Sequence, residues 1–143
     1  MSTRSTIRIS SPGKDSTHIY RHMDGYPAIG GFDLANTIAK HPKVLYRDRM
    51  LAVTETLLRM SYSEDNYIYE LTELCEDHSD REWHYEVALK GNDTKITVYS
   101  CQYASPQDSR KTEDVTFTGT IESFLKYTEK ERNTMVERAK ASA

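Results

Sequence analysis

The feature that most constrains the fold is a strict alternation of apolar and polar residues in the second half of the chain. Large apolar side chains occupy every second position there: Trp83, Tyr85, Val87 and Leu89. Successive side chains of a β-strand point to opposite faces, so this period of two predicts a strand with one buried face. Gly91-Asn92-Asp93 provides turn residues, and Lys95–Gln102 follows with two apolar positions in alternation. The sequence therefore predicts an antiparallel hairpin within a sheet.

A second hairpin is predicted near the N-terminus. Ser5–Ser10 alternates polar residues with Ile7 and Ile9. The following Ser11–Asp15 contains proline and glycine, which favour a tight turn. We expect the second strand of this hairpin over Thr17–Met23.

The remaining strand signals extend the sheet. Asn66–Leu74 is rich in tyrosine. We expect it to begin a meander of consecutive antiparallel strands that continues into the 83–102 hairpin. Residues 103–114 are polar, so we expect a loop there, long enough to be a binding element. Val115–Thr118 then adds a short strand.

Three helices are predicted from apolar residues at helical spacing: Phe32–Lys40, Arg47–Tyr62 and Ile121–Ala141. The apolar face of the last helix is confined to its beginning, around Phe124 and Leu125. We therefore expect its end either to project into solvent or to pack against a partner chain.

These elements together predict an α+β fold: an N-terminal β-hairpin, two helices, an antiparallel β-meander and a C-terminal helix. We expect a single domain over residues 1–143, with 128–143 as a candidate projecting helical tail. The length of 143 residues suits one core. A domain of this size buries roughly two-thirds of the surface that its unfolded chain exposes.

The charge balance argues against several classes of partner. The chain carries 19 Lys and Arg against 22 Asp and Glu, a formal net charge of −3, with both signs interspersed. Strong nucleic-acid binding needs a basic surface that releases counterions from phosphates, so we do not expect it. No apolar run approaches the ~20 residues of a membrane span, and no early run is long enough for a signal peptide. We expect a cytoplasmic protein without membrane contacts.

The sequence contains no recognisable motif for catalysis or metal binding. Cys75 and Cys101 lack a CxxC pair, which favours two reduced thiols. His18 and His22 would lie roughly 13 Å apart on one face of a strand, too far to share an ion. No GxSxG elbow and no HxxxH in a helical context occurs. We therefore expect no catalytic residues, no metal and no cofactor, and a protein that is not an enzyme.

The densest group of functional side chains lies between the second strand and the first helix, in Tyr20–Pro27. Asp24-Gly25 favours a turn, and Pro27 restricts the residue before it to extended geometry, so backbone requirements explain part of this stretch. Its side chains can stack and hydrogen-bond, and we interpret them as a surface that binds a partner or a ligand. The candidate binding residues are Tyr20, Arg21, His22, Asp24 and Tyr26.

The stretch Tyr20–Pro27 reads Tyr-x-His-x-Asp-Gly-Tyr-Pro. It resembles a signature shared by a group of small proteins from phages, prophages and bacteria, in which Met23 is often replaced by tryptophan. No activity is attached to the signature, so the resemblance implies a context and no catalytic residue. Small phage proteins of this kind often act as stoichiometric binders. They include inhibitors of bacterial immunity that block a CRISPR complex or sequester a nucleotide signal.

Three hypotheses about function follow. The leading one is an inhibitor or adaptor that binds a host protein or protein complex in the host cytoplasm, favoured by the ten tyrosines. The alternative is a module that sequesters a nucleotide-like molecule, with Tyr20, Arg21, His22 and Tyr26 stacking on it and hydrogen-bonding to it. The third is a small metal-dependent hydrolase that uses His22 and Asp24. The end of the last helix also leaves a homodimer open.

Overall fold

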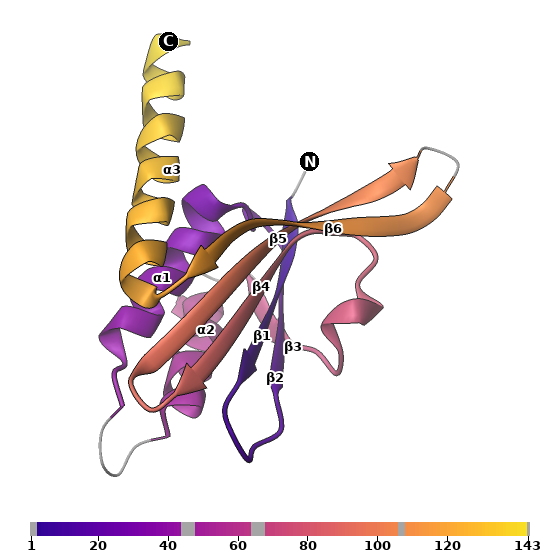
Figure 1. Cartoon of the computed structure of the whole chain (residues 1–143). Coiled ribbons are helices and arrows are strands. Elements are labelled where there is room, and N and C mark those ends of the chain that lie inside the picture. The colour runs from indigo at the N-terminus through magenta and orange to yellow at the C-terminus, as the bar shows by residue number, and fades with distance from the viewer. Residues whose placement is uncertain (1–2, 44–47, 64–67, 106–107, 143) are drawn as a thin grey trace.

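The computed structural model describes residues 3–43, 48–63, 68–105 and 108–142 of the chain. Within them, a six-stranded sheet packs against helices (Figure 1). The strands are β1 (Arg4–Ser10), β2 (Thr17–Arg21), β3 (Tyr69–Leu71), β4 (Arg81–Lys90), β5 (Asp93–Ser105) and β6 (Asp108–Gly119). The helices are α1 (Phe32–Lys40), α2 (Arg49–Ser63) and α3 (Ile121–Ala141), with a π-helical turn η1 (Pro27–Gly31) and a 3-10 turn η2 (Cys75–Asp77). The predicted α+β class is confirmed.

The strands follow the order β3-β2-β1-β4-β5-β6 across the sheet. Neighbouring strands are antiparallel except β1 and β4, which run parallel with Thr6 opposite His84 and Arg8 opposite Glu86. The N-terminal strand therefore joins the β1–β2 hairpin to the meander of β4, β5 and β6. This parallel pairing decides which side chains meet at the candidate site described below.

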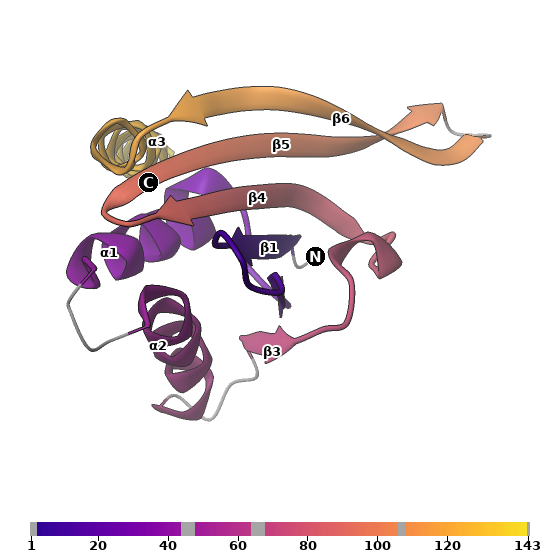
Figure 2. The same ribbon diagram turned by 60° about the horizontal axis from the view of Figure 1, so that its bottom comes forward.

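One face of the sheet forms the core. Figure 1 shows α1 and α2 behind the sheet, and Figure 2 shows them on the same side of it. The side chains between these layers are apolar and almost fully buried: Ile7, Ile9, Ile19, Leu34, Ile38, Val53, Leu57, Tyr85, Val87, Ile96 and Val98. Each aliphatic side chain of this size contributes about 1.5–3 kcal/mol when buried. The other face, toward the viewer in Figure 1, is covered by none of α1, α2 and α3, and only the segment around η2 packs on it, over Tyr20.

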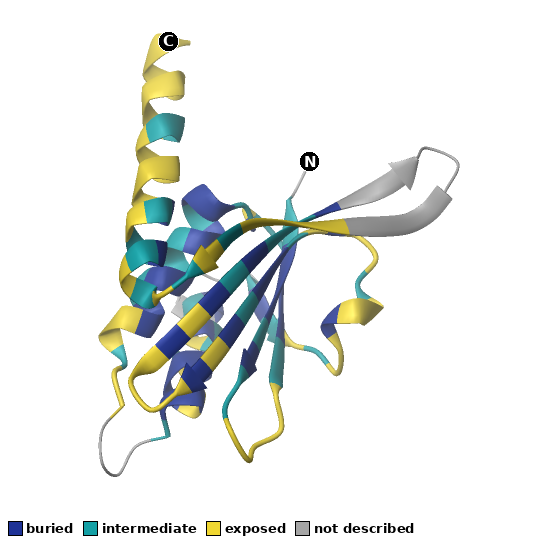
Figure 3. Ribbon diagram, in the orientation of Figure 1, coloured by how far each residue is buried: buried dark blue, intermediate teal, exposed yellow. Residues whose placement is uncertain are grey.

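Helix α3 packs on the body mainly through its first half, and in its second half Arg132 still lies 4.5 Å over the ring of Phe32. Its N-terminus is capped by Thr120, whose Oγ1 accepts a hydrogen bond from the Ser123 N–H at 3.3 Å. Phe124 lies between Tyr85 and Phe117, with ring centroids 6.3 and 5.6 Å away. The helix then extends away from the sheet, and residues 136–142 are all exposed (Figure 3). The assignment of 128–143 as a separate tail stays a prediction.

Two predictions about the sheet are wrong. Residues 103–114 were expected to form a loop, but β5 continues to Ser105 and β6 begins at Asp108, so most of this segment is a hairpin. Figure 1 shows that hairpin beyond the part of the sheet that the helices cover, and its sequence lacks the apolar alternation from which the other strands were predicted. In addition, β3 is not the first strand of the meander, because it pairs with β2 at the opposite edge of the sheet.

Some predicted boundaries also change. The second strand of the N-terminal hairpin ends at Arg21 and not at Met23, because the chain turns into the corner that precedes η1. Helix α2 begins at Arg49, while position 47 of the predicted helix lies outside the described residues. Positions 66–67 of the predicted Asn66–Leu74 strand lie outside them as well.

Candidate functional site

The corner formed by Tyr20–Gly31 is held by close backbone packing. The Gly25 N–H donates to the Thr3 carbonyl at 2.9 Å, and the Gly30 N–H donates to the Asp24 carbonyl at 2.9 Å. A Cβ on Gly25 would lie 2.5 Å from the side chain of Ser5, and one on Gly30 would lie 2.9 Å from the Cα of Gly25. Both glycines are therefore needed because the backbones approach closely.

Arg21 is buried inside this corner and points toward the helices. Only 3% of the residue is exposed, and its Nε donates to the Met23 carbonyl at 2.6 Å. Its Nη1 donates to Asp33 Oδ2 at 3.0 Å and also contacts the hydroxyl of Tyr69. These hydrogen bonds link the end of β2 to the start of α1, so Arg21 stabilises the corner from inside.

Tyr20 is buried on the other face of the sheet, beneath the segment that contains η2. Its exposed fraction is 4%, its ring stacks on His78 at 4.0 Å, and its hydroxyl donates to Asp80 Oδ2 at 2.8 Å. Burial, and then the hydrogen bond to Asp80, raise the pKa of Tyr20 to about 12. Neither Tyr20 nor Arg21 therefore presents its side chain to solvent.

The other three candidate residues reach the surface. His22 packs edge-on against Tyr20, with ring centroids 4.6 Å apart. Its Nε2 lies 3.2 Å from Glu70 Oε1, an ion-pair distance without hydrogen-bond geometry. Asp24 is exposed with a positive φ of 52°, and Tyr26 beside it is half-buried. The candidates thus fall into separate groups: Tyr20 with His22, Asp24 with Tyr26, and Arg21 alone toward the helices.

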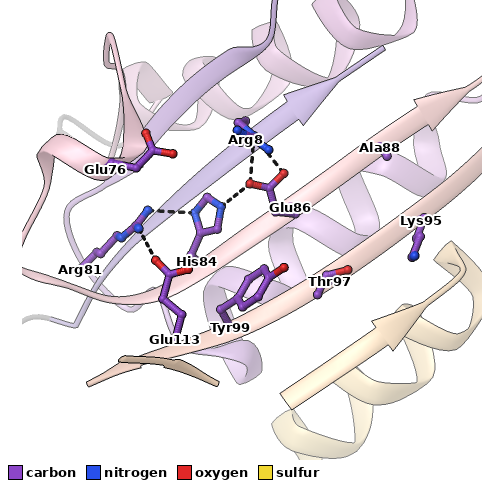
Figure 4. A pocket seen from close by; sticks show the side chains of 10 residues that line it. All are labelled: Arg8, Glu76, Arg81, His84, Glu86, Ala88, Lys95, Thr97, Tyr99 and Glu113. Atoms are coloured by element: carbon purple, nitrogen blue, oxygen red, sulfur yellow. Dashed lines mark hydrogen bonds and ion pairs between the residues drawn. The ribbon is translucent and has the colours of Figure 1, made fainter. Parts of the chain in front are cut away.

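A different set of residues forms a connected polar network on the uncovered face of the sheet (Figure 4). We call this set the open-face cluster, and it comprises Thr6, Arg8, Arg81, His84, Glu86 and Glu113. His84 Nδ1 lies 2.7 Å from Thr6 Oγ1, and His84 Nε2 lies 2.7 Å from Glu86 Oε1. The Arg8 Nε donates to Glu86 Oε2 at 3.0 Å, and Arg81 Nη2 donates to Glu113 Oε1 at 2.6 Å.

The hydrogen bonds assign the tautomer of His84. Arg81 Nη1 lies 3.0 Å from Thr6 Oγ1 and 3.3 Å from His84 Nδ1. A guanidinium group only donates, so Nδ1 is the acceptor and Nε2 carries the proton that it donates to Glu86. Both ring nitrogens are therefore engaged, and the ring is buried with 4% exposed.

The acidic and thiol groups near His84 are also held in unreactive states. Burial raises the pKa of Glu86, but the hydrogen bonds from His84 and Arg8 and the charge of Arg8 outweigh it and keep the pKa below its ordinary value. Glu86 is therefore ionised near neutral pH. Cys75 is fully buried, and this burial raises the pKa of its thiol to about 11. A protonated thiol is a poor nucleophile.

A hollow of about 380 Å³ opens beside the open-face cluster. Its rim includes Ala88, whose small side chain leaves space, together with Lys95, Thr97 and Tyr99 from β5 (Figure 4). The Tyr99 ring lies 5.9 Å from that of His84, and no hydrogen bond joins the side chain of Lys95 or Tyr99 to another residue drawn there. On one side of the hollow, hydrogen bonds fix the side chains of the open-face cluster. On the other side, Lys95 and Tyr99 have no such hydrogen bonds within this set of residues.

Sequence reasoning did not identify the open-face cluster. His84 and Glu86 stand on the polar side of the predicted strand, which was the available signal. Thr6 and Arg8 join them only because β1 pairs in parallel with β4, a long-range contact that no local pattern reveals.

No metal centre emerges from the described parts of the chain. Among them, no group of three or more His, Cys, Asp or Glu side chains is placed to hold an ion. The helices described here also lack a stretch both long and apolar enough to cross a membrane. No protein-family model matches the chain, and no curated protein or solved structure matches it either.

Proposed function

We propose that this protein acts by stoichiometric binding to another protein and not by catalysis, and that the uncovered face of the sheet around the open-face cluster is its binding surface. The resemblance of Tyr20–Pro27 to phage proteins suggests the context. The partner is then a host protein or complex, such as a CRISPR complex of a bacterial defence system, in the host cytoplasm.

The observation that carries this proposal is the closed state of the open-face cluster. A general base needs a ring nitrogen within reach of substrate, and both nitrogens of His84 bind protein groups. Thr6 is fully buried, so its hydroxyl cannot meet a substrate. Such a network holds charged side chains in fixed positions, which suits a surface that recognises a preformed partner.

The charges around the hollow favour a protein partner over a polyanion. Arg8, Arg81 and Lys95 are balanced by Glu76, Glu86 and Glu113 on the same lining. A nucleic-acid surface needs an excess of positive charge to displace counterions. A balanced, fixed pattern of both signs instead gives specificity toward a complementary protein surface.

The sheet also offers a binding edge. β6 is the last strand in the sheet order, and Val115 on it is 56% exposed. Together with β5 it extends the uncovered face beyond the body (Figure 1). An edge strand has unpaired backbone groups that a partner strand can use, which adds affinity to the contacts made by side chains.

Site-specific photo-crosslinking tests this proposal. A photoreactive amino acid replaces Thr97 at the hollow, and a control protein carries it at Leu51, which is 59% exposed on α2. After irradiation in bacterial host cells, we expect the Thr97 variant to form an adduct of one defined mass and the Leu51 variant to form none. The proposal fails if the Thr97 variant gives no adduct, or if both positions give the same set.

A second candidate function is binding of a nucleotide-like ligand in the hollow. It is favoured by the ammonium of Lys95 and the hydroxyl of Tyr99, which form no hydrogen bond with another residue drawn in Figure 4. Thermal unfolding with cyclic nucleotides tests this candidate, because a ligand at 100 times its Kd adds about 2.7 kcal/mol of stability. A rise in Tm that is lost in Lys95→Ala would support it, and an unchanged Tm with every nucleotide would exclude it.

A further inference from the structure

The second half of α3 carries a regular stripe of residues that continues beyond the body. The stripe has the spacing of a heptad pattern, alternating four and three residues: Phe124, Thr128, Glu131, Met135, Arg138 and Ser142. Phe124 and Thr128 are fully buried against the body. The same side of the helix continues outward through Glu131, Met135 and Arg138, where the body covers it only in part.

This surface borders a groove next to the corner. The groove holds about 330 Å³ and is lined by Tyr26, Ala28, Glu131, Thr134, Met135 and Arg138. Met135 and Thr134 are half-buried at its centre, while Glu131 and Arg138 are exposed at its two ends. Apolar and small side chains thus lie between one acidic and one basic residue.

The two charged ends of the groove lack partners within the described chain. The side chains of Glu131 and Arg138 form no hydrogen bond or ion pair with another residue that the structure describes. They are seven residues apart, about 10.5 Å along the helix, which is too far for them to pair with each other.

A two-fold axis between two copies of the chain would bring each of these charges opposite one of the other sign. When a second α3 runs antiparallel about a point between Thr134 and Met135, position 131 lies opposite position 138 of the other helix. Glu131 then faces the partner's Arg138, and Arg138 faces the partner's Glu131. At the centre, Thr134 lies opposite the partner's Met135, and Met135 lies opposite the partner's Thr134. An isologous interface of this kind is the commonest form of homodimer.

We infer that the second half of α3 pairs antiparallel with α3 of a second copy of this chain, with two symmetric Glu131–Arg138 ion pairs on either side of Met135. The end of the partner helix lies along the groove beside Tyr26 and Ala28. This gives Tyr26 of the corner a role in self-association. The inference is independent of the partner proposed above, because it uses a different surface.

Reversing the charges tests both the contact and its register. We expect sedimentation equilibrium of the full chain to give twice the chain mass of 16.5 kDa. Glu131→Arg alone and Arg138→Glu alone each turn both ion pairs into repulsions, and each should raise the dimer Kd by about tenfold or more. A mixture of equal amounts of the two variants has opposite charges in both pairs, so it should form a heterodimer with near wild-type affinity.

A matched control is Lys126→Glu, which makes the same change of charge on an exposed residue of α3 about 120° around the helix from Arg138. It should leave the dimer Kd within about twofold of the wild-type value. Circular dichroism of each variant checks that α3 remains folded. The inference is overturned if the wild-type chain is monomeric at about 200 µM, if Lys126→Glu weakens the dimer as much as Arg138→Glu, or if the mixed variants remain monomeric.

Discussion

The corner at Tyr20–Gly31 and the open-face cluster are both rich in charged and aromatic side chains, but they use them differently. In the corner, Arg21 donates to the Met23 carbonyl and to Asp33, and the glycines let backbones touch, so these groups serve the chain itself. In the open-face cluster, the side chains bind one another and leave Arg8 40% exposed on an open surface. A high density of functional residues in a sequence therefore marks either internal bracing or a binding surface, and the groups that these side chains contact in the fold tell the two apart.

The largest expected effect in this comparison comes from Arg21→Met. It removes a buried cation, leaves the Met23 carbonyl and Asp33 without their donor, and should lower the free energy of unfolding by about 3 kcal/mol. Arg8→Met makes the same chemical change on the open face and should cost about 1 kcal/mol or less, because that ion pair is partly exposed to solvent. Urea unfolding measures both losses in the free energy of unfolding. Equal losses would show that the two arginines stabilise the fold to the same extent and that the two regions do not differ in this respect.

An intermediate effect is expected for Gly25→Ala. The new Cβ would lie 2.5 Å from the Ser5 side chain, so the corner must shift. The expected cost is about 1–3 kcal/mol. The closest atoms are the Cβ and Oγ of Ser5, and the Ser5 backbone N lies 2.9 Å away, so the double variant Gly25→Ala, Ser5→Gly should recover part of the loss but not all of it in a double-mutant cycle. Additive losses would show that the backbone conformation, and not this contact, requires glycine.

The smallest expected effect is the loss of folding stability that protonation of Glu86 causes at low pH. The pKa of Glu86 is lower in the folded chain than its ordinary value of 4.5, so its ionised form stabilises the fold above about pH 4.5. This contribution is lost as the pH falls through the folded pKa. It amounts to at most about 1 kcal/mol, because the side chain remains partly exposed.

Urea unfolding at pH 7 and at pH 3 measures this contribution. Glu86→Gln should lose less stability between the two pH values than the wild-type chain does. Glu82→Gln, an exposed change on the same strand, should behave like the wild type. An unchanged pH dependence in Glu86→Gln would mean that His84 and Arg8 do not favour the ionised carboxylate in solution.

Local patterns in the sequence were sufficient for the elements that have one buried face. The alternation at Trp83–Leu89 predicted β4, and the apolar positions of α1 and α3 predicted those helices at the places where they form. The same reasoning failed at 103–114, where the hairpin lies beyond the layer of helices. It also failed for β3, because the choice between two edges of a sheet depends on tertiary contacts and not on local residues.

The candidate site was harder to predict for a related reason. Tyr20 and Arg21 looked like surface residues because tyrosine and arginine are common at interfaces, yet each is satisfied internally in the fold. His84 and Glu86 looked like ordinary residues of a solvated strand face. They form a network only because Thr6 and Arg8 lie opposite them, and these two residues belong to β1, near the start of the chain.

The central position of β1 has a consequence for biosynthesis. Thr6 and His84, neighbours in the finished sheet, are separated by 78 positions along the chain. At a translation rate of about 5–20 residues per second, roughly 4–16 s pass between their syntheses. During that interval the β1–β2 hairpin has one open side, and an isolated hairpin is only marginally stable in water. The nascent hairpin therefore exposes the unpaired edge of β1 until β4 emerges and pairs with it.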